Sequence, residues 1–452
     1  MVQLDESSAR LRDRLMSKRP DLDKWSRYYE GTQPLEYMSQ ELVRELDGRI
    51  RQVIVNWPRL VVDSLEERLD VEGFQINQKV QDRLWEFWQA NALDEASQQA
   101  HVDALVHRRS YVIVGAGAPG EPVITVESAQ QVYAERDPRT RKVTSAIKRW
   151  TDEDGVAEWL TLYLPNETVW YSSEDAGQTW AEPQMDEHRL GVVPVVPLVN
   201  RGRILDPDGV SELADVVPLS DAACKIATDM MISAEFHAMP RRMVVGLSED
   251  DQMDQDGRPI SKWAQIAGRV WAIDALPAEV HAQQFAEADL NNFHQTLNTL
   301  ARMVASMSGL PPHFLGYSDA NPASADAIRS AETRLIKRAE RRQRAFGGAW
   351  EQVMRLALMV SGEEMPEGIE SLETVWRDAS TPTVAQQADA VVKLRQSGLI
   401  SLRQARQDLG YSHEQIKAME ADDAKAVNRV LDNDMASLMG PKPAATEEEP
   451  EE

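Results

Sequence analysis

The sequence predicts an α+β protein that is predominantly helical, with a strand-rich insert in its N-terminal half and a long kinked helix in its C-terminal half. Three observations support this fold class. Apolar residues recur at steps of three and four up to residue 105 and again after residue 212, as on helices that bury one face. Short β-type runs separated by turns begin at residue 110. One helical stripe then continues without a break over residues 323–361.

The first 105 residues are expected to be mainly helical. The stretch LRDRLMSKRPDLDKWSRYYEG predicts a charged helix that is broken at Pro20 and ends near Gly31. A second helical pattern places its inward side chains at Leu60, Val61, Ser64, Leu65 and Leu69. The same period continues with Leu84, Phe87, Trp88 and Leu93.

The strand-rich insert consists of the runs SYVIV, PVITV, QVYAE, KVTSAIKRW, EWLTLYL and ETVWYSS. Their connections are too short for crossovers, so the strands are expected to be antiparallel. Within the insert, GAGAPG at residues 115–120 matches the pattern of a dinucleotide-binding loop. That loop should lead into a helix, whereas here another strand follows after Glu121-Pro122. We therefore interpret GAGAPG as a hairpin connection.

Two helices surround a small insert in the next part of the chain. The first is expected over residues 212–238, with Pro218 tolerated near its start, and the second over residues 285–308. The insert between them is mixed in pattern and locally acidic. Pro311 and Pro312 are expected to stop the second helix, because proline cannot donate a helical hydrogen bond.

The longest helix is expected over residues 323–361, with a bend at Gly347-Gly348. Arg342 is the only polar member of its inward stripe. The other members are Ile328, Ala331, Leu335, Ala339, Phe346, Trp350, Val353, Ala357 and Val360. Shorter helices are expected at residues 382–396, 401–409 and 412–436, followed by a disordered tail, GPKPAATEEEPEE.

Composition limits the functional classes. The chain has 452 residues and a net charge of −25, which argues against a protein that wraps DNA through phosphate neutralisation. It does not exclude a protein that DNA slides past, because a like-charged surface prevents adhesion. The single cysteine, Cys224, permits no intrachain disulfide and is expected to be a small core residue. The longest run without charged residues contains two prolines, so we expect a soluble, intracellular product.

No motif with a confirming context indicates catalysis. The P-loop pattern, the G-x-S-x-G elbow and the H-E-x-x-H metal motif do not occur in the sequence. We therefore expect no enzyme, no cofactor and no defined metal site. An acidic cluster in the small insert leaves weak cation binding open; it consists of Glu249, Asp250, Asp251, Asp254 and Asp256.

A basic block at the start of the long helix stands out in this acidic chain. Its candidate site residues are Arg334, Lys337, Arg338, Arg341, Arg342 and Arg344. The simplest interpretation is a solvated or ion-paired helix face. The alternatives are contact with phosphate groups, or pairing with an acidic neighbouring subunit.

The order of these parts resembles the portal proteins of tailed double-stranded DNA phages, in the siphophage portal family. The most similar piece is SGLPPHFLG, followed by a small-residue loop and a long helix. The resemblance covers roughly residues 20–435. It implies a phage-portal architecture of wing, stem, clip and crown, and a non-enzymatic ring of twelve copies around a DNA channel.

The resemblance also divides the chain. The implied parts are an N-terminal wing at 1–205, stem helix 1 at 206–239, a clip at 240–284, stem helix 2 at 285–309, a tunnel loop at 310–324, the wing long helix at 325–380, crown helices at 381–436 and a disordered acidic tail at 437–452. The tunnel-loop residues expected to face DNA are Gly316, Tyr317, Ser318, Asp319, Ala320 and Asn321.

The implied function is that of a portal subunit at one capsid vertex, which conducts viral DNA during packaging and ejection. The implied partners are further copies of the chain, double-stranded DNA bound non-specifically, the terminase large subunit, the major capsid and scaffolding proteins, and head-completion or adaptor proteins, with no membrane. The protein would be made in the host cytoplasm and reside in the virion. The alternatives are another minor head or adaptor protein, and a nucleotide-binding enzyme that uses GAGAPG.

Overall fold

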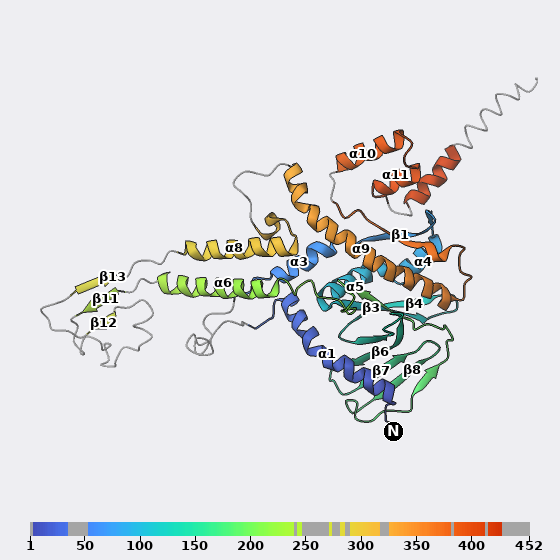
Figure 1. The fold of residues 1–452 in the computed structure, drawn as a ribbon, viewed down its shortest axis with the longest axis horizontal. Coiled ribbons are helices and arrows are strands. Elements are labelled where there is room, and N and C mark those ends of the chain that lie inside the picture. The colour runs from blue at the N-terminus through green and yellow to red at the C-terminus, as the bar shows by residue number, and fades with distance from the viewer. Residues whose placement is uncertain are drawn as a thin grey trace, which may run out of the picture.

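Helices and sheets form one body from which two long helices project (Figure 1). The computed structural model describes residues 3–34, 53–238, 242–245, 271–273, 281–284, 290–316, 325–380, 384–411 and 415–426. Helix accounts for 50% of the structure and strand for 19%, which confirms a mixed fold with an excess of helix.

The first helix, α1 (Glu6–Glu30), is continuous. It ends at Gly31, which adopts the left-handed conformation with φ 72°, so the predicted end is confirmed. The predicted break at Pro20 is wrong, because Pro20 lies inside the helix. Proline removes one helical hydrogen bond, but α1 is held to a neighbouring sheet before this point by ion pairs such as that of Arg12 with Glu158.

The predicted antiparallel strands are confirmed, and they divide into two sheets. The first sheet has the order β10-β3-β4 and consists of β3 (Arg109–Ala116), β4 (Pro122–Ser128) and β10 (Val195–Val199). The second is a meander of β5 (Val132–Arg136), β6 (Val143–Thr151), β7 (Glu158–Tyr163), β8 (Thr168–Ser173) and β9 (Gln184–Asp186). Helix α1 packs against β5 and β6 of the meander.

The GAGAPG segment is a hairpin connection, as predicted. Strands β3 and β4 pair antiparallel up to Ala116 and Pro122, so the first two residues of the segment still belong to β3 and the rest form the turn. The N–H of Gly117 donates to the carbonyl of Glu121 at 3.1 Å and closes the turn. No helix follows the glycines, so the dinucleotide-binding interpretation lacks the helix N-terminus that it requires.

The helical pattern after residue 57 is interrupted more often than predicted. It forms α3 (Trp57–Glu66), α4 (Asp82–Ala90) and α5 (Leu93–His107). The expectation that the first of these extends to Leu69 is wrong, because the helix ends at Glu66 and a strand, β1 (Val71–Ile76), begins soon after it. Leu69 is nevertheless fully buried in the core.

Strand β1 belongs to a sheet that sequence analysis missed. It lies between β2 (Lys79–Val80) and β14 (Leu372–Trp376), which follows the short 3-10 helix η3 (Ile369–Ser371). Ile76 of β1 pairs with Leu372 of β14, almost three hundred positions along the chain. The sheet therefore ties the N-terminal region to the segment after the long helix.

That helix, α9 (Ala325–Ser361), passes across the body and packs on β3, β4 and β10. Most of its predicted inward stripe is confirmed, since Leu335, Ala339, Phe346, Trp350, Val353 and Ala357 are buried. Ala331 is exposed, contrary to the prediction. Gly347 leaves room for β14, because a Cβ there would lie 3.1 Å from Nε1 of Trp376. The bend at this glycine stays a prediction.

Aromatic side chains of α9 pack against those of the N-terminal helices. The rings of Trp350 and Trp88 meet edge to face at 5.0 Å, and His101 stacks on Phe346 at 5.2 Å. Nε1 of Trp350 donates to Nε2 of His101 at 2.9 Å. Burial lowers the pKa of His101 to about 3, so this imidazole is neutral and belongs to the core.

The projecting pair consists of α6 (Val217–Ala238) and α8 (Asn291–Ser308), which lie side by side (Figure 1). Helix α6 begins five residues later than predicted, with Pro218 near its start as expected. Cys224 of this helix is buried, also as expected. A small sheet lies beyond the far ends of the pair; it consists of β11 (Arg242–Val245), β12 (Trp271–Ile273) and β13 (His281–Gln284).

The C-terminal helices agree with the prediction. They are α10 (Val384–Gln396), α11 (Leu402–Asp408) and a helix over residues 415–426. The predicted disordered tail lies outside the described residues. None of the described helices is long and apolar enough to cross a membrane.

Candidate functional site

The structure describes one of the three predicted sites in full. All six residues of the basic block lie on α9. Of the tunnel-loop candidates, Gly316 is described, and it ends the 3-10 helix η2 (Pro312–Leu315) with φ 82°. The tunnel-loop candidates outside the described residues are Tyr317, Ser318, Asp319, Ala320 and Asn321. The acidic candidates outside the described residues are Glu249, Asp250, Asp251, Asp254 and Asp256.

Helix α8 stops two residues before the proline pair. Gly309 takes the left-handed conformation, φ 71°, directly after the last helical residue, Ser308. Arg334 of α9 crosses this helix end and donates to the carbonyl of Ser306. A cation at a helix C-terminus is favourable, because the free carbonyls there carry partial negative charge. Helix α8 therefore ends at Gly309, and Arg334 stabilises that end. The proline pair comes after the end of the helix and does not cause it, contrary to the prediction.

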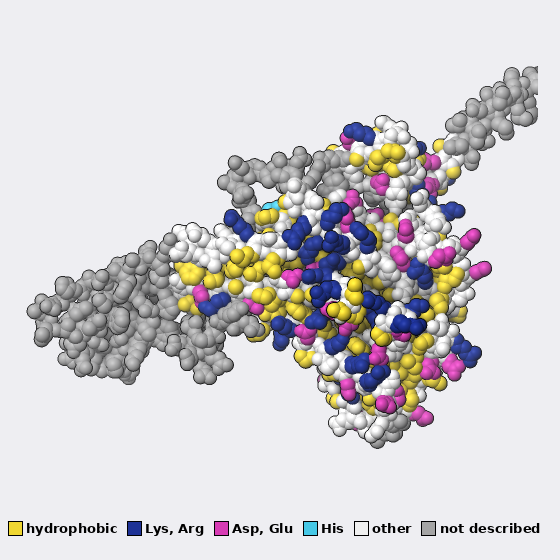
Figure 2. All heavy atoms as spheres, viewed as in Figure 1, with side chains coloured by type: hydrophobic (Ala, Val, Ile, Leu, Met, Phe, Trp, Pro, Cys, Tyr) yellow, Lys and Arg dark blue, Asp and Glu magenta, His cyan; other side chains and the backbone are white. Residues whose placement is uncertain are grey.

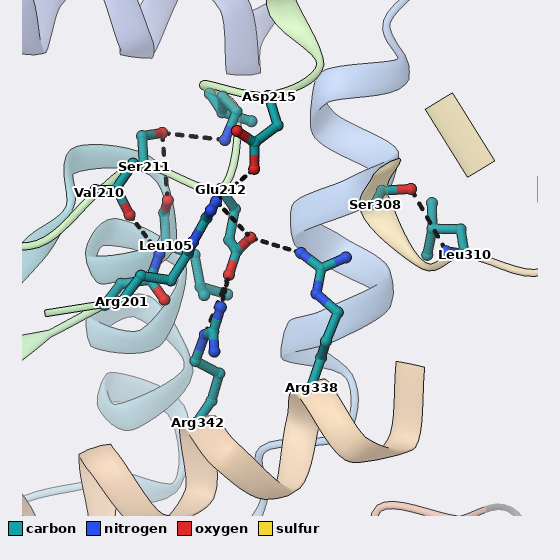
Figure 3. A network of polar contacts seen from close by, with 12 residues as sticks. Leu105, Arg201, Val210, Ser211, Glu212, Asp215, Ser308, Leu310, Arg338 and Arg342 are labelled. Carbon is teal, nitrogen blue, oxygen red and sulfur yellow. Dashed lines mark hydrogen bonds and ion pairs between the residues drawn. The ribbon is translucent and has the colours of Figure 1, made fainter. Parts of the chain in front are cut away.

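A buried carboxylate, that of Glu212, organises the centre of the basic block (Figure 3). Its side chain has 0% exposure. Nη2 of Arg338 donates to its Oε2 at 2.6 Å, and Nε of Arg342 donates to its Oε1 at 3.1 Å. Arg201 approaches from the opposite side, with Nη1 at 3.7 Å from Oε2. Three guanidinium groups therefore surround one carboxylate.

The turn before α6 fixes Glu212 in this position. The backbone N–H of Glu212 donates to the carbonyl of Leu105 at 2.9 Å, which holds the turn against the end of α5. Asp215, one turn further on, accepts from Arg201 at 2.7 Å. Residues 201–215 thus supply Arg201, Glu212 and Asp215 to a charged surface, and α9 supplies the other residues of that surface.

Burial and charge act in opposite directions at Glu212. Burial alone would raise its pKa, but the charges of Arg342 and Arg338 outweigh burial and hold the pKa below its usual value. Burial lowers the pKa of Arg338, and the charge of Glu212 opposes that effect. The carboxylate is therefore ionised at neutral pH. Removing it would leave arginines buried without a counter-charge, which costs more than an exposed pair contributes.

These elements enclose a groove of about 490 Å³. Six of its lining residues are cationic, namely Arg201, Arg334, Lys337, Arg338, Arg341 and Arg342. Gly202, Asp215 and Met307 complete the lining. Figure 2 shows the corresponding gathering of Lys and Arg beside the projecting helices, next to hydrophobic surface. We call this site the basic groove.

Sequence analysis predicted five of the six cations of the basic groove. It identified the cations of α9, and its ion-paired interpretation is confirmed for Arg338 and Arg342. It missed Glu212, Arg201 and Asp215, because nothing local distinguishes them from the other charged residues of an acidic chain. The available signal was Arg342 itself, a charged residue in an otherwise apolar stripe, which needed a buried partner from elsewhere.

The fold and the groove together define a class of protein. Two long helices project from a mixed body, and a charged surface lies where they join it (Figures 1 and 2). This arrangement places an extended charged surface at the base of a projecting helix pair. The sequence profile described as "Phage portal protein, SPP1 Gp6-like" matches residues 9–429. The chain therefore belongs to the SPP1 Gp6-like family of phage portal proteins.

Curated relatives agree with this assignment. The portal protein of Mycobacterium phage D29 is 40% identical over 402 residues, which cover 85% of this chain and 81% of the relative. The portal protein of Mycobacterium phage L5 is 37% identical over 449 residues, covering 94% and 91%. A solved chain from the neck of an empty GTA particle is 14% identical with a TM-score of 0.46, covering 83% of this chain and 94% of that one.

Proposed function

We propose that the chain is a portal subunit of a phage head, and that copies of it form a ring around a channel for double-stranded DNA. The observation that carries this proposal is family membership over residues 9–429. The projecting pair α6 and α8, with a small sheet beyond its far ends, supports it. A helix pair of this kind suits a stem that lines a channel and presents a small domain to partners.

The proposed division of the subunit is the one that the family resemblance implies. Residues 206–239 and 285–309 form the stem, and residues 240–284 form the clip between them. Residues 1–205 and 325–380 form the wing, and residues 381–436 form the crown. Residues 310–324, after α8, form the tunnel loop, and residues 437–452 form an acidic tail.

The proposed partners are those that the family resemblance implies. The clip docks the terminase large subunit during packaging and the adaptor proteins afterwards, while the wing contacts the major capsid and scaffolding proteins at the portal vertex. DNA passes the tunnel loop without sequence-specific contact. The acidic residues of the clip segment, repeated around the ring, would discourage DNA from adhering to it.

The ring is tested directly by electron microscopy of the purified chain. We expect closed rings with a central hole wide enough for double-stranded DNA. A homogeneous monomer under assembly conditions would contradict the proposal. Small assemblies without a central hole would instead indicate a minor head or adaptor protein.

A further inference from the structure

The basic groove carries more positive charge than the described residues of its own chain neutralise. Its six cations contact three carboxylates among the described residues: Glu212, Asp215 and Glu340. Three positive charges are therefore left over in a chain whose net charge is −25. A concentrated excess of the minority charge on one surface indicates a site for an anionic partner.

The groove cations differ in how deeply they are buried and in whether they pair with a carboxylate. Arg338 and Arg342 bind Glu212 and are largely buried, so their positions are fixed. Lys337 pairs with Glu340 at 2.7 Å on the surface. Arg341 is exposed, and no carboxylate of the described residues pairs with it. The fixed arginines form the base of the groove, and Arg341 lies at its accessible side.

Apolar surface continues from the edge of the groove onto α8. Met307 lines the groove and is 49% exposed, and Met303, one turn earlier on the same helix face, is 47% exposed. Arginine and methionine are enriched in the cores of protein interfaces, whereas lysine is depleted there. Five of the six groove cations are arginines. This combination favours a protein partner, since a phosphate backbone offers methionine side chains little apolar surface.

We propose that the basic groove binds carboxylate side chains of a second copy of this chain. The chain is rich in the complementary charge, because Asp and Glu outnumber Lys and Arg by 74 to 49. The groove presents guanidinium forks, which match carboxylates in bidentate geometry. The contact is heterologous: the groove of one subunit meets a different, acidic face of the next, as closure of a ring requires. This inference rests on the ring proposed above.

The proposal predicts that charge reversal at Arg341 weakens subunit association. Arg341→Glu should lower association by about 5- to 30-fold, and should make the rings dissociate at a salt concentration that wild-type rings survive. The measurement is sedimentation velocity of assembled rings across a salt series. The matched control is Arg344→Glu, the same charge change three positions along α9, at a residue that is 78% exposed and outside the groove.

A second measurement identifies the partner group. Lys337 supplies the one amine in the groove, so carbodiimide treatment can couple it to a carboxylate in contact with the groove. In rings assembled from mixed ¹⁴N- and ¹⁵N-labelled subunits, we expect mixed-isotope cross-links from Lys337 to an Asp or Glu of another copy. Changing that acid to Arg should then restore association to the Arg341→Glu variant.

The outcomes separate this inference from the ring proposal. Wild-type chains that never form rings would overturn both. Wild-type rings with equal salt stability in both variants, and with Lys337 coupled only to its own Glu340, would overturn the groove alone. Rings that stay stable in Arg341→Glu but lose affinity for a DNA duplex, with Arg344→Glu unaffected, would assign the groove to phosphate groups and overturn the protein partner.

Discussion

Two buried carboxylates, Glu158 and Glu212, are held by arginines in different ways. Glu158 begins β7 and is 1% exposed. Arg149 of β6 contacts both of its oxygens, at 2.7 and 3.0 Å, and Arg12 of α1 donates from Nε at 3.1 Å. This cluster joins the first helix to the meander sheet, and its two arginines leave an excess of one positive charge.

Glu212 has a third arginine and adjoins a groove. Arg201, Arg338 and Arg342 come from two segments more than a hundred residues apart. Asp215 neutralises one of these charges through Arg201, and the remaining excess of one adds to Arg334 and Arg341, which pair with no carboxylate of the described residues around the same groove. The comparison teaches that one kind of cluster can serve two purposes. At Glu158 it joins two elements, whereas at Glu212 it also builds the base of a charged surface.

The largest expected effect is the loss of the charge at Glu212. Glu212→Gln keeps the shape of the side chain but leaves Arg338 and Arg342 without their counter-charge and Arg201 with Asp215 alone, which should cost about 3–5 kcal/mol of unfolding free energy. Glu158→Gln should cost less, because one of its two arginine partners, Arg12, is 25% exposed and can reach water, whereas Arg338 and Arg342 at Glu212 are 18% and 10% exposed. Tryptophan fluorescence during urea unfolding measures both variants. A larger loss for Glu158→Gln would contradict the comparison.

The next effect concerns the turn that positions Glu212. Gly209 has φ 81°, and a Cβ there would lie 2.2 Å from the backbone oxygen of Asn200. Gly209→Ala should therefore cost about 1–3 kcal/mol, because the backbone must move. Gly348→Ala is the matched control, since this helical glycine of α9 has open space at its Cβ and should gain up to about 1 kcal/mol. Urea midpoints compare the two, and equal losses would show that the turn is not constrained.

Local patterns predicted most of the elements. The strand runs, the paired projecting helices and most of the inward stripe of α9 follow from periodicity within one segment, and the structure confirms them. The break at Pro20 was predicted from proline chemistry alone and is wrong, because α1 continues through Pro20 while distant ion pairs such as Arg12–Glu158 join the helix to the meander sheet. A single sequence does not show which distant residue will form an ion pair with a given side chain.

The missed features share one physical cause. Strand β1 finds its partner β14 about three hundred residues away, and Glu212 meets Arg342 after 130 residues. Neither pairing produces a periodic pattern in the sequence of its own segment. Arg342 was the exception, because a charge inside an apolar stripe is costly unless it is paired. It pointed to a buried acid without identifying which one.

The smallest effect tests Asp208, whose ion pairs join α1 and β3 to the turn before Glu212. Asp208, in the turn before Glu212, accepts from Lys18 of α1 at 2.6 Å and from Arg109 of β3 at 2.8 Å. Burial would raise its pKa, but Arg109 and Lys18 lower it to about 2, from 3.8 in an unfolded chain. The stability it contributes is therefore complete above about pH 4 and is lost as the pH falls towards 2.

Asp208→Asn should flatten the dependence of stability on pH in this window, measured by urea midpoints from pH 5 to pH 2. The matched change at an exposed pair, Asp389→Asn beside Lys393, should leave the slope as it is, because such surface pairs contribute about 0–1 kcal/mol. An unchanged slope in Asp208→Asn would show that α1 and the Glu212 turn are not coupled through this carboxylate.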